Sequence, residues 1–408
     1  MLYPRDLKKA GGSSIRISGL CKSLSKKCDV KIFSRGDLPA DMPDKIANIK
    51  LKNIYLPPNY FLISPLLPER LMLNNILLLN SPGALQLINS DYDILQCNKH
   101  GPALIGLMLK QKIGSPILFD MHGLLQSEAK LNRNASIKDG ILYKLYIEAE
   151  KKLLSRSYAI STPSDEMSNF VSSAFGLPRQ KIFTIPDGVD IDLFNGTKKS
   201  NVEAVRNDID ATGRRIIMYI GDISPLHDSI NFIKSLYLIN KKFENEVLFV
   251  IITHGPSVTK IRKEYFELVQ GLDNIVIHPP IPHDILPIYL KAADLLVIPY
   301  TNDLFSNMVP HLKTLEYMAS GTPIVASRTR GIRDILKHKI NAFLVEPESP
   351  ESMANGIIYA LENEEMAKEI GINALNYVSK YFSWDISSKK ALEAYAMMIE
   401  RWENERKV

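Results

Sequence analysis

Short apolar runs alternate with amphipathic segments along the whole chain, and this alternation constrains the fold more than any other feature. In the first half, the predicted strands are Asp29–Phe33, Asp93–Cys97, Pro116–Phe119, Tyr158–Thr162 and Lys181–Ile185. In the second half, they are Arg215–Ile220, Glu246–Ile252, Asn274–Ile277, Leu295–Pro299, Pro323–Ala326 and Ala342–Val345. The segments between them include Ser14–Lys26, Ser229–Lys242 and Glu351–Glu362, which have the apolar spacing of helices. Strands that alternate with helices predict parallel sheets and an α/β fold.

The chain is long enough for two domains, since its 408 residues exceed the roughly 100–200 that one domain usually holds. The polar segment 195–213 separates two halves of similar size, and such a composition is typical of a linker. We therefore predict an N-terminal domain over residues 1–194 and a C-terminal domain over residues 214–382. A last helix over residues 383–408 is expected to pack across both domains.

The beginning of the chain departs from the usual order of a doubly wound domain, which is strand, glycine turn and helix. Here the turn at Gly11 and Gly12 and the following helix come almost at once, after the segment Tyr3–Asp6, which does not resemble a strand. We expect that the first strand is missing. The alternative is an unusual domain that never had this strand.

The overall composition narrows the class of protein. The net charge of +5 is only mildly basic, so it does not indicate a nucleic-acid-binding protein, but it suits an anionic ligand or a transient contact with a membrane. Three scattered cysteines indicate neither a disulfide framework nor a metal cluster and suit a reducing cytoplasm. No window reaches about 18 uninterrupted apolar residues, so we expect no membrane span and at most a peripheral position at the inner membrane face.

The segment Lys313–Ser327 carries the strongest chemical signal. It predicts a helix that ends at Gly321 and a buried strand that starts at Pro323, with the helix beginning at the carboxyl end of the sheet. The free N–H groups at a helix N-terminus suit a pyrophosphate. Glu316, one turn into the helix, suits a ribose diol, and Lys313 adds positive charge. The alternative is that both side chains belong to a solvated helix face.

Four motifs, which follow one another along the chain in the order and spacing of the family, make the chain similar to the retaining glycosyltransferases of family four. They are Glu316–Pro323 (Glu-Tyr-Met-Ala-Ser-Gly-Thr-Pro), Ile185–Phe194 with its Asp-Gly-Val-Asp core, Tyr289–Pro299 with its Ala-Asp pair, and Phe382-Ser-Trp384. The resemblance extends from Gly11 to the final helix. It implies the GT-B fold, in which two Rossmann-like domains face each other across a cleft and the last helix crosses back.

The resemblance also implies roles for individual residues. Glu316 would bind the ribose of a nucleotide-sugar donor, and its pyrophosphate would face Lys313 with the backbone of Thr314 and Leu315. The loop at Ile281 would touch the base through its backbone. Two residues of the N-terminal domain complete this set.

Gly12 would let the first helix approach the donor phosphate or the acceptor. His122, at the end of a strand, would lie close to the reacting sugar, so that His122 and Glu316 are the catalytic candidates. The alternative for His122 is a structural or capping role.

Two departures from the family pattern concern charge. Met308 stands eight positions before Glu316, where the family usually has a first glutamate, and Asp303 lies too far back to replace it. The family often has Gly-Arg and Lys-Gly after the first strand of the C-terminal domain, whereas this chain has Gly221-Asp222 and His227-Asp228. His227 is expected to offer a hydrogen bond and to carry a charge only when a phosphate raises its pKa. Donor binding would therefore be weakened but not abolished.

The expected chemistry is electrostatic stabilisation of a nucleoside diphosphate leaving group, without a metal or other cofactor. The expected partners are a nucleotide-sugar donor and a glycan or lipid-linked acceptor in polysaccharide or glycolipid assembly. The stretch Tyr60–Leu79 could touch a membrane, although a core helix is the alternative. Two rival hypotheses remain: a non-catalytic GT-B binding subunit, and a sugar-nucleotide epimerase of the same fold.

Overall fold

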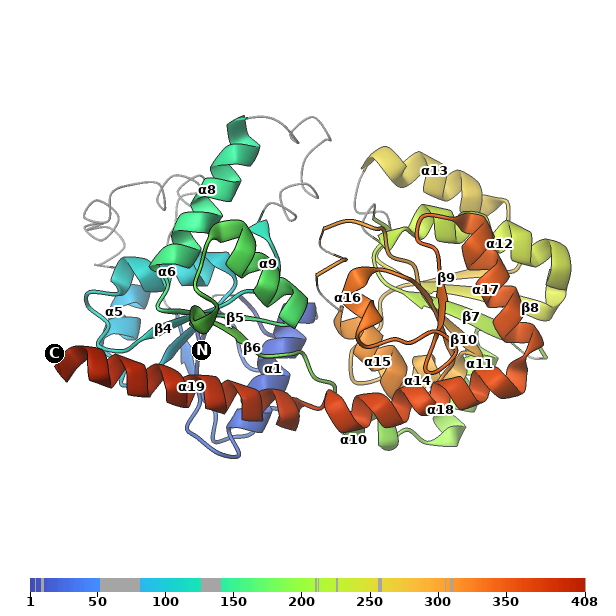
Figure 1. The fold of residues 1–408 in the computed structure, drawn as a ribbon. Coiled ribbons are helices and arrows are strands. Elements are labelled where there is room, and N and C mark those ends of the chain that lie inside the picture. Colours follow the sequence, from blue (N-terminus) through green and yellow to red (C-terminus); the bar gives the residue numbers. More distant parts are fainter. Residues whose placement is uncertain are drawn as a thin grey trace. The chain divides into compact units, whose positions relative to one another are not determined.

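The computed structural model describes residues 1–3, 5–8, 11–51, 81–125, 141–209, 211, 213–224, 227–255, 259–304, 306–308 and 311–407. The chain forms two compact units (Figure 1). The first unit comprises Met1–Gly188 and Trp384–Val408, and the second comprises Val189–Ser383. The stretch Tyr60–Leu79, for which we considered a membrane contact, lies outside the described residues. Within the described residues, no helix has the length and apolar character needed to cross a membrane.

The first unit is built on parallel strands. Four of them follow in the order β3 (Leu95–Asn98), β4 (Ile117–Asp120), β5 (Ala159–Thr162) and β6 (Ile182–Thr184). The strands β1 (Lys31–Ser34) and β2 (Ala47–Lys50) form a separate parallel pair. The α-helices of this unit are α1 (Gly12–Leu24), α5 (Pro82–Ile88), α6 (His100–Leu109), α8 (Ile141–Arg156), α9 (Asp165–Phe175) and α19 (Trp384–Lys407), and a 3₁₀ turn lies at Arg179–Lys181.

Residues 1–3 lie between β1 and β3, at the place where we expected the first strand to be missing. Leu2 pairs in parallel with both Phe33 of β1 and Cys97 of β3. Its N–H group donates to the carbonyl of Gln96 at 2.7 Å, and the N–H of Tyr3 donates to the carbonyl of Phe33 at 3.0 Å. This place in the sheet is therefore filled. Three residues are too few to form a recognisable apolar run, which is why the sequence did not predict the pairing.

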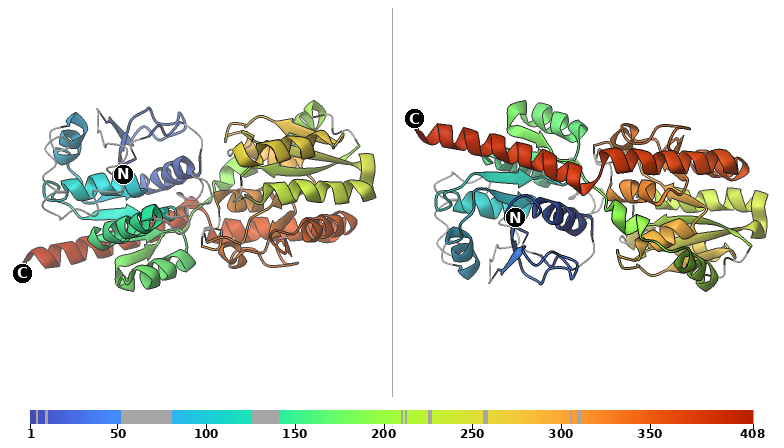
Figure 2. Two further views of the ribbon diagram at one scale, coloured as in Figure 1. Left: turned by 90° about the horizontal axis from the view of Figure 1, so that it is seen from above. Right: turned by 90° about the horizontal axis from the view of Figure 1, so that it is seen from below.

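The last helix, α19, packs on α1 within the first unit (Figures 1 and 2). Gly19 of α1 lies against the indole ring of Trp384, the first residue of α19. A side chain at Gly19 would collide with this ring. The aromatic start of the final helix thus has a packing role, since its ring fills the space that glycine leaves open.

The second unit contains a six-stranded parallel sheet in the order β12-β11-β10-β7-β8-β9. Its strands are β7 (Arg215–Ile220), β8 (Val247–Ile252), β9 (Ile275–His278), β10 (Leu295–Ile298), β11 (Ile324–Ser327) and β12 (Phe343–Val345). The first strand in sequence, β7, lies in the middle, with β8 on one side and β10 on the other. This reversal is the switch point of a doubly wound sheet, where ligands bind beyond the carboxyl ends of the strands.

Helices cover both faces of this sheet. One face packs on α12 (Ser229–Phe243), α13 (Thr259–Gln270) and α17 (Pro350–Glu362). The other packs on α10 (Ile191–Asn195), α11 (Lys199–Asp208), α14 (Leu286–Ala292), α15 (Leu312–Ser320) and α18 (Glu364–Tyr381). The short segments α16 (Arg330–Arg333) and a 3₁₀ turn at Glu244–Glu246 complete the unit. Along β7, Ile216 and Met218 enter one core and Ile217 and Tyr219 enter the other, as the alternation of a strand requires.

The segment 195–213 contains the helix α11, so our prediction of a linker there is wrong. Arg206 of α11 donates hydrogen bonds to the carbonyl of Ala292 at 2.7 Å and to the carboxylate of Asp294 at 3.0 Å. Asp294 also accepts from the N–H of Ile216 at the start of β7. No residue of α11 is fully buried, which explains why its composition is as polar as that of a linker.

Candidate functional site

The helix α15 begins next to the switch point of the second sheet. Its N-cap residue, His311, makes no side-chain capping hydrogen bond, and the N–H of Thr314 bonds back to the carbonyl of His311 at 2.8 Å. No described residue accepts a hydrogen bond from the N–H groups of Leu312 or Lys313. Such N–H groups carry the positive end of the helix dipole and suit an anion. At the other end, Gly321 adopts the left-handed conformation with φ of 73°, which confirms the predicted end of the helix.

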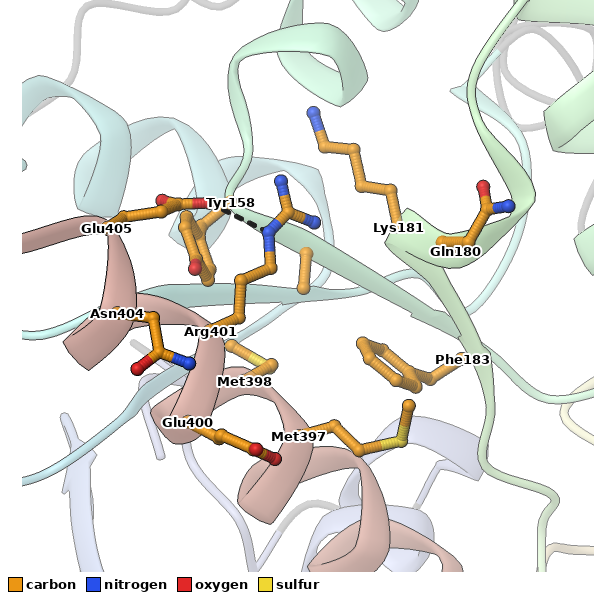
Figure 3. A pocket seen from close by; sticks show the side chains of 11 residues that line it. Tyr158, Gln180, Lys181, Phe183, Met397, Met398, Glu400, Arg401, Asn404 and Glu405 are labelled. Atoms are coloured by element: carbon orange, nitrogen blue, oxygen red, sulfur yellow. Dashed lines mark hydrogen bonds and ion pairs between the residues drawn. The ribbon is translucent and has the colours of Figure 1, made fainter. Parts of the chain in front are cut away.

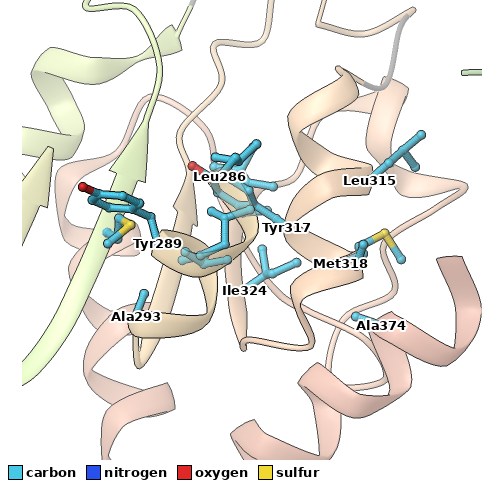
Figure 4. Packing of buried hydrophobic residues seen from close by; sticks show 14 of the residues in the cluster. Leu286, Tyr289, Ala293, Leu315, Tyr317, Met318, Ile324 and Ala374 are labelled. Atoms are coloured by element: carbon cyan, nitrogen blue, oxygen red, sulfur yellow. The ribbon is translucent and has the colours of Figure 1, made fainter. Parts of the chain in front are cut away.

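Core packing fixes the position of α15. Leu315, Tyr317 and Met318 are buried in the core that Figure 4 shows, together with residues of α14 and α18. The hydroxyl of Tyr317 accepts a hydrogen bond of 2.8 Å from the N–H of Ile220 at the end of β7. Because the side chain of Leu315 points into the core, only its backbone is available to a ligand. The side chain of Thr314 is also buried.

Glu316 is buried, so the alternative of a solvated helix face is wrong for this residue. Its side chain is only 9% exposed, and its Oε1 lies 2.8 Å from Nε2 of His283. His283 belongs to the turn between β9 and α14. A buried carboxylate is stable when it is hydrogen-bonded, and its remaining acceptor sites suit vicinal hydroxyl groups.

Lys313 places its ammonium group among aromatic rings. Its Nζ lies 5.2 Å from the ring centroid of Tyr219 and 5.8 Å from that of Tyr300. Burial lowers the pKa of Lys313 to about 8, although the charges of Asp222 and Glu316 act in the opposite direction. No carboxylate of the described residues forms an ion pair with this lysine. The ammonium group of Lys313 has therefore already lost much of its hydration before a phosphate binds to it.

Gly221 follows β7 and leaves room for this ammonium group. A side chain at Gly221 would collide with Nζ of Lys313 and with the hydroxyl of Tyr219. The neighbouring Asp222 is exposed. Lys313 therefore brings positive charge to the end of β7, where this chain has Asp222 in place of the arginine of the family pattern.

His227 lies near this lysine but adds no charge. Its Nδ1 is 2.8 Å from Oγ of Ser224, and its ring centroid is 6.0 Å from that of Tyr300. Burial, followed by the charges of Lys313 and His311, lowers the pKa of His227 well below its usual value. His227 is therefore neutral at physiological pH and can offer a hydrogen bond only.

Three further residues that the sequence singles out, Ile281, Met308 and Asp303, belong to the second unit. Ile281 packs its side chain partly against the core, which leaves its backbone for a base. Met308 is buried. The carboxylate of Asp303 bonds within its own turn, to Oγ1 of Thr301 at 2.6 Å and to the N–H of Ser306 at 2.9 Å. Asp303 therefore holds the turn together, which fits the expectation that it does not replace the family's first glutamate.

In the first unit, His122 follows β4 and is held on both sides. Its Nε2 lies 2.8 Å from Oδ2 of Asp120, and its Nδ1 lies 3.2 Å from Oγ of Ser13 in the first turn of α1. Gly12 is the first residue of that helix and is exposed. Because Asp120 is an ionised acceptor, Nε2 of His122 carries the proton in the bond between them.

Asp120 is the centre of a buried polar network. Arg16 of α1 donates to both of its oxygens at 3.1 and 3.0 Å, and donates to Asp187 at 2.7 Å. The hydroxyl of Ser161 and the amide of Gln96 also donate to Asp120. Burial alone would raise the pKa of Asp120, but the charges of Arg16 and His122 outweigh burial and hold it well below its usual range.

A cavity of about 580 Å³ lies elsewhere in the first unit, between α19 and the amino ends of β5 and β6 (Figure 3). Lys181, Arg401, Phe183 and Met397 are among its lining residues. Burial lowers the pKa of Lys181 to about 8, with contributions from the charges of Arg401 and Lys110. His122 and Asp120 lie at the carboxyl ends of the same parallel sheet, so this cavity does not belong to the candidate site.

Two family models match most of the chain. The model described as Glycosyltransferase Family 4 matches residues 10–193, and the model described as Glycosyl transferases group 1 matches residues 202–377. The division between the two models falls close to the boundary between the two units of the structure.

Curated relatives are similar over most of their length. The D-inositol 3-phosphate glycosyltransferase of Thermobispora bispora is 23% identical over 324 residues, which are 76% of this chain and 72% of that protein. The D-inositol 3-phosphate glycosyltransferase 2 of Catenulispora acidiphila is 23% identical over 407 residues, which are 96% and 91% of the two chains.

Solved structures share the fold over nearly the whole chain. The Anabaena protein HepE, in complex with UDP and glucose, matches with a TM-score of 0.72 and 17% identity, covering 97% of this chain and 98% of HepE. Sucrose-phosphate synthase from Thermosynechococcus elongatus matches with a TM-score of 0.70 and 20% identity, covering 98% and 96%.

Proposed function

Because this chain belongs to glycosyltransferase family four and has the GT-B fold, we propose that it transfers a sugar from a nucleotide-diphosphate donor to a glycan or lipid-linked acceptor, with retention and without a metal ion. Its activity as a glycosyltransferase is the activity of the relatives that it matches.

One observation carries the proposal: Lys313 and Glu316 lie one turn apart at the N-terminus of α15, beside the switch point of the sheet. The N–H groups at the start of α15 and the ammonium group of Lys313 suit the two phosphates of a donor. Glu316 suits the ribose, whose vicinal hydroxyls donate to a carboxylate. The combination of an anion site and a diol site fits a nucleoside diphosphate better than a simple anion.

The same groups account for the chemistry. When the bond from the anomeric carbon to the diphosphate breaks, negative charge grows on the leaving oxygen. A preorganised cation and helix N–H groups stabilise that charge more in the transition state than in the ground state. Since Lys313 already supplies positive charge, we propose that the step needs no metal.

For the donor base we propose uracil, because HepE binds UDP in its crystal structure. For the acceptor, the relatives named D-inositol 3-phosphate glycosyltransferases make a phosphorylated polyol the first compound to test beside glycans and lipid-linked sugars. His122 remains our candidate for a contact with the reacting sugar. Its strand-end position and its hydrogen bond to Asp120 support that role.

The affinity for UDP should fall as the pH rises from 7 to 10. The charged form of Lys313 binds phosphate, so its contribution is complete below its pKa of about 8 and is lost as the pH rises through that value. Loss of one charge-assisted bond weakens binding by about tenfold to a hundredfold. Calorimetric titration at pH 7, 8, 9 and 10 measures the effect. Lys313→Met should bind weakly with no such pH dependence, and a wild-type affinity that stays constant would contradict the assignment.

The proposed function is tested by following release of UDP from UDP-sugars with a panel of acceptors. We expect release that depends on one acceptor, together with a product of the same anomeric configuration as the donor by NMR, in the presence of EDTA. Conversion of the donor to another nucleotide sugar without acceptor would support the epimerase instead. Absence of turnover with every common nucleotide sugar would contradict the transferase proposal.

A further inference from the structure

The hydrogen bond between His283 and Glu316 joins two separate elements at the candidate donor site. His283 lies in the turn before α14, and Glu316 lies in α15, 33 residues later in the chain. Nε2 of His283 and Oε1 of Glu316 are 2.8 Å apart, the distance of a charge-assisted hydrogen bond. An ionised carboxylate only accepts, so Nε2 carries the proton in this bond.

We propose that His283 is a positioning residue that fixes the carboxylate of Glu316 for the donor ribose; this inference rests on the proposed function. A glutamate side chain has three rotatable bonds and would otherwise have to be ordered when the donor binds. The bond to His283 orders it beforehand. Among the described residues, His283 is the side chain that hydrogen-bonds to Glu316.

The geometry leaves the carboxylate able to bind a diol. An ionised carboxylate has about four acceptor sites on its two oxygens. His283 occupies one site on Oε1. The second oxygen and the remaining site on Oε1 are left for the 2′- and 3′-hydroxyls, so His283 and the ribose do not compete for the same site.

His283 is partly exposed, but the elements on either side of its bond to Glu316 are held by packing. Its side chain is 33% exposed, whereas that of Glu316 is 9% exposed. The backbone N–H of Leu286 donates to the carbonyl of His283 at 3.3 Å, which ties the turn to the start of α14. Because α14 and α15 belong to one core, the bond is held by packed elements on both sides.

The test compares UDP with 2′,3′-dideoxy-UDP on the full-length wild type, His283→Ala and His283→Gln. We expect His283→Ala to raise the Kd for UDP by about tenfold, which is what ordering one flexible side chain on binding costs. With the dideoxy nucleotide, which lacks the hydroxyls, the change should be less than about twofold. His283→Gln should bind UDP nearly as well as wild type, because its amide can donate from a similar position.

The outcomes separate this inference from the proposed function. Equal weakening with both nucleotides would show a merely structural effect and overturn the inference, as would unchanged binding of UDP by His283→Ala. If Glu316→Gln loses its preference for UDP over the dideoxy form while His283→Ala keeps it, the donor site stands and only the role of His283 fails. If wild type binds no nucleoside diphosphate, both fail together.

Discussion

Replacing Arg16 with methionine is expected to lower the free energy of unfolding of the first unit by about 3–5 kcal/mol. Arg16 is almost completely buried and pairs with two carboxylates, Asp120 and Asp187. The substitution keeps an apolar side chain of similar length but leaves both carboxylates in the interior without their counter-charge. Urea-induced unfolding at pH 7, followed by circular dichroism, measures the loss.

The pH dependence of this effect has a definite sign. In wild type, the pKa of Asp120 is lowered, so its contribution is present above the unfolded-state pKa of about 4 and is lost only at more acid pH. Without Arg16, burial raises the pKa of the carboxylate, and protonation then relieves the penalty. The difference between wild type and Arg16→Met should therefore shrink between pH 7 and pH 5.

Arg406→Met is the matched control, because Arg406 is exposed on α19 in the same unit. This variant should change the free energy of unfolding by less than about 0.5 kcal/mol. A change of similar size in both variants, or a loss below about 1 kcal/mol in Arg16→Met, would contradict the view that Arg16 compensates two buried charges.

Replacing Glu316 with alanine should lower kcat/KM for the donor by about a hundredfold to ten-thousandfold. Two hydrogen bonds from the ribose to a charged acceptor are lost, and each contributes about 1.5–3 kcal/mol. The comparison requires initial rates of nucleotide release at low donor concentration and a check that the melting temperature is retained. Glu369→Ala is the control, since Glu369 is an exposed glutamate of the same unit. Full kcat/KM in Glu316→Ala would exclude the ribose role.

Much of the fold could be predicted from the alternation of apolar runs. All eleven predicted strands are present within a few residues of their predicted bounds. The strand β2 (Ala47–Lys50) was not predicted, because it lies at an edge and is only partly buried, so its residues lack an apolar pattern. The helix α11 falls in the segment predicted as a linker for a related reason, since a helix with no fully buried residue shows little apolar periodicity.

The candidate site was predictable where its residues are neighbours in the sequence. Lys313 and Glu316 stand three positions apart, so helical spacing alone places both in the first turns of α15. The partners that determine their state come from elsewhere: Tyr219 from β7, Tyr300 after β10 and His283 from the turn before α14. No local pattern indicates that these segments meet.

The same limit applies to the network around His122. Asp120, two residues before His122, is the part of this network that lies close to the histidine in the sequence. Arg16 and Asp187 lie 104 and 67 positions from Asp120 in the chain, and only the tertiary structure brings them together. In the sequence, Arg16 stands between the apolar residues Ile15 and Ile17, and a charged residue in such a place is a hint that a buried partner exists.

The central claim is that the second unit binds a nucleoside diphosphate at the start of α15. A thermal-shift panel of UDP, GDP, ADP and CDP on wild type and Glu316→Ala tests it most directly. A ligand at a hundred times its Kd stabilises the folded state by about 2.7 kcal/mol, which raises the melting temperature measurably. We predict that one nucleotide, UDP, stabilises wild type and that Glu316→Ala loses most of this shift. No shift with any of the four nucleotides, or an equal shift in both proteins, would contradict the assignment of the donor site.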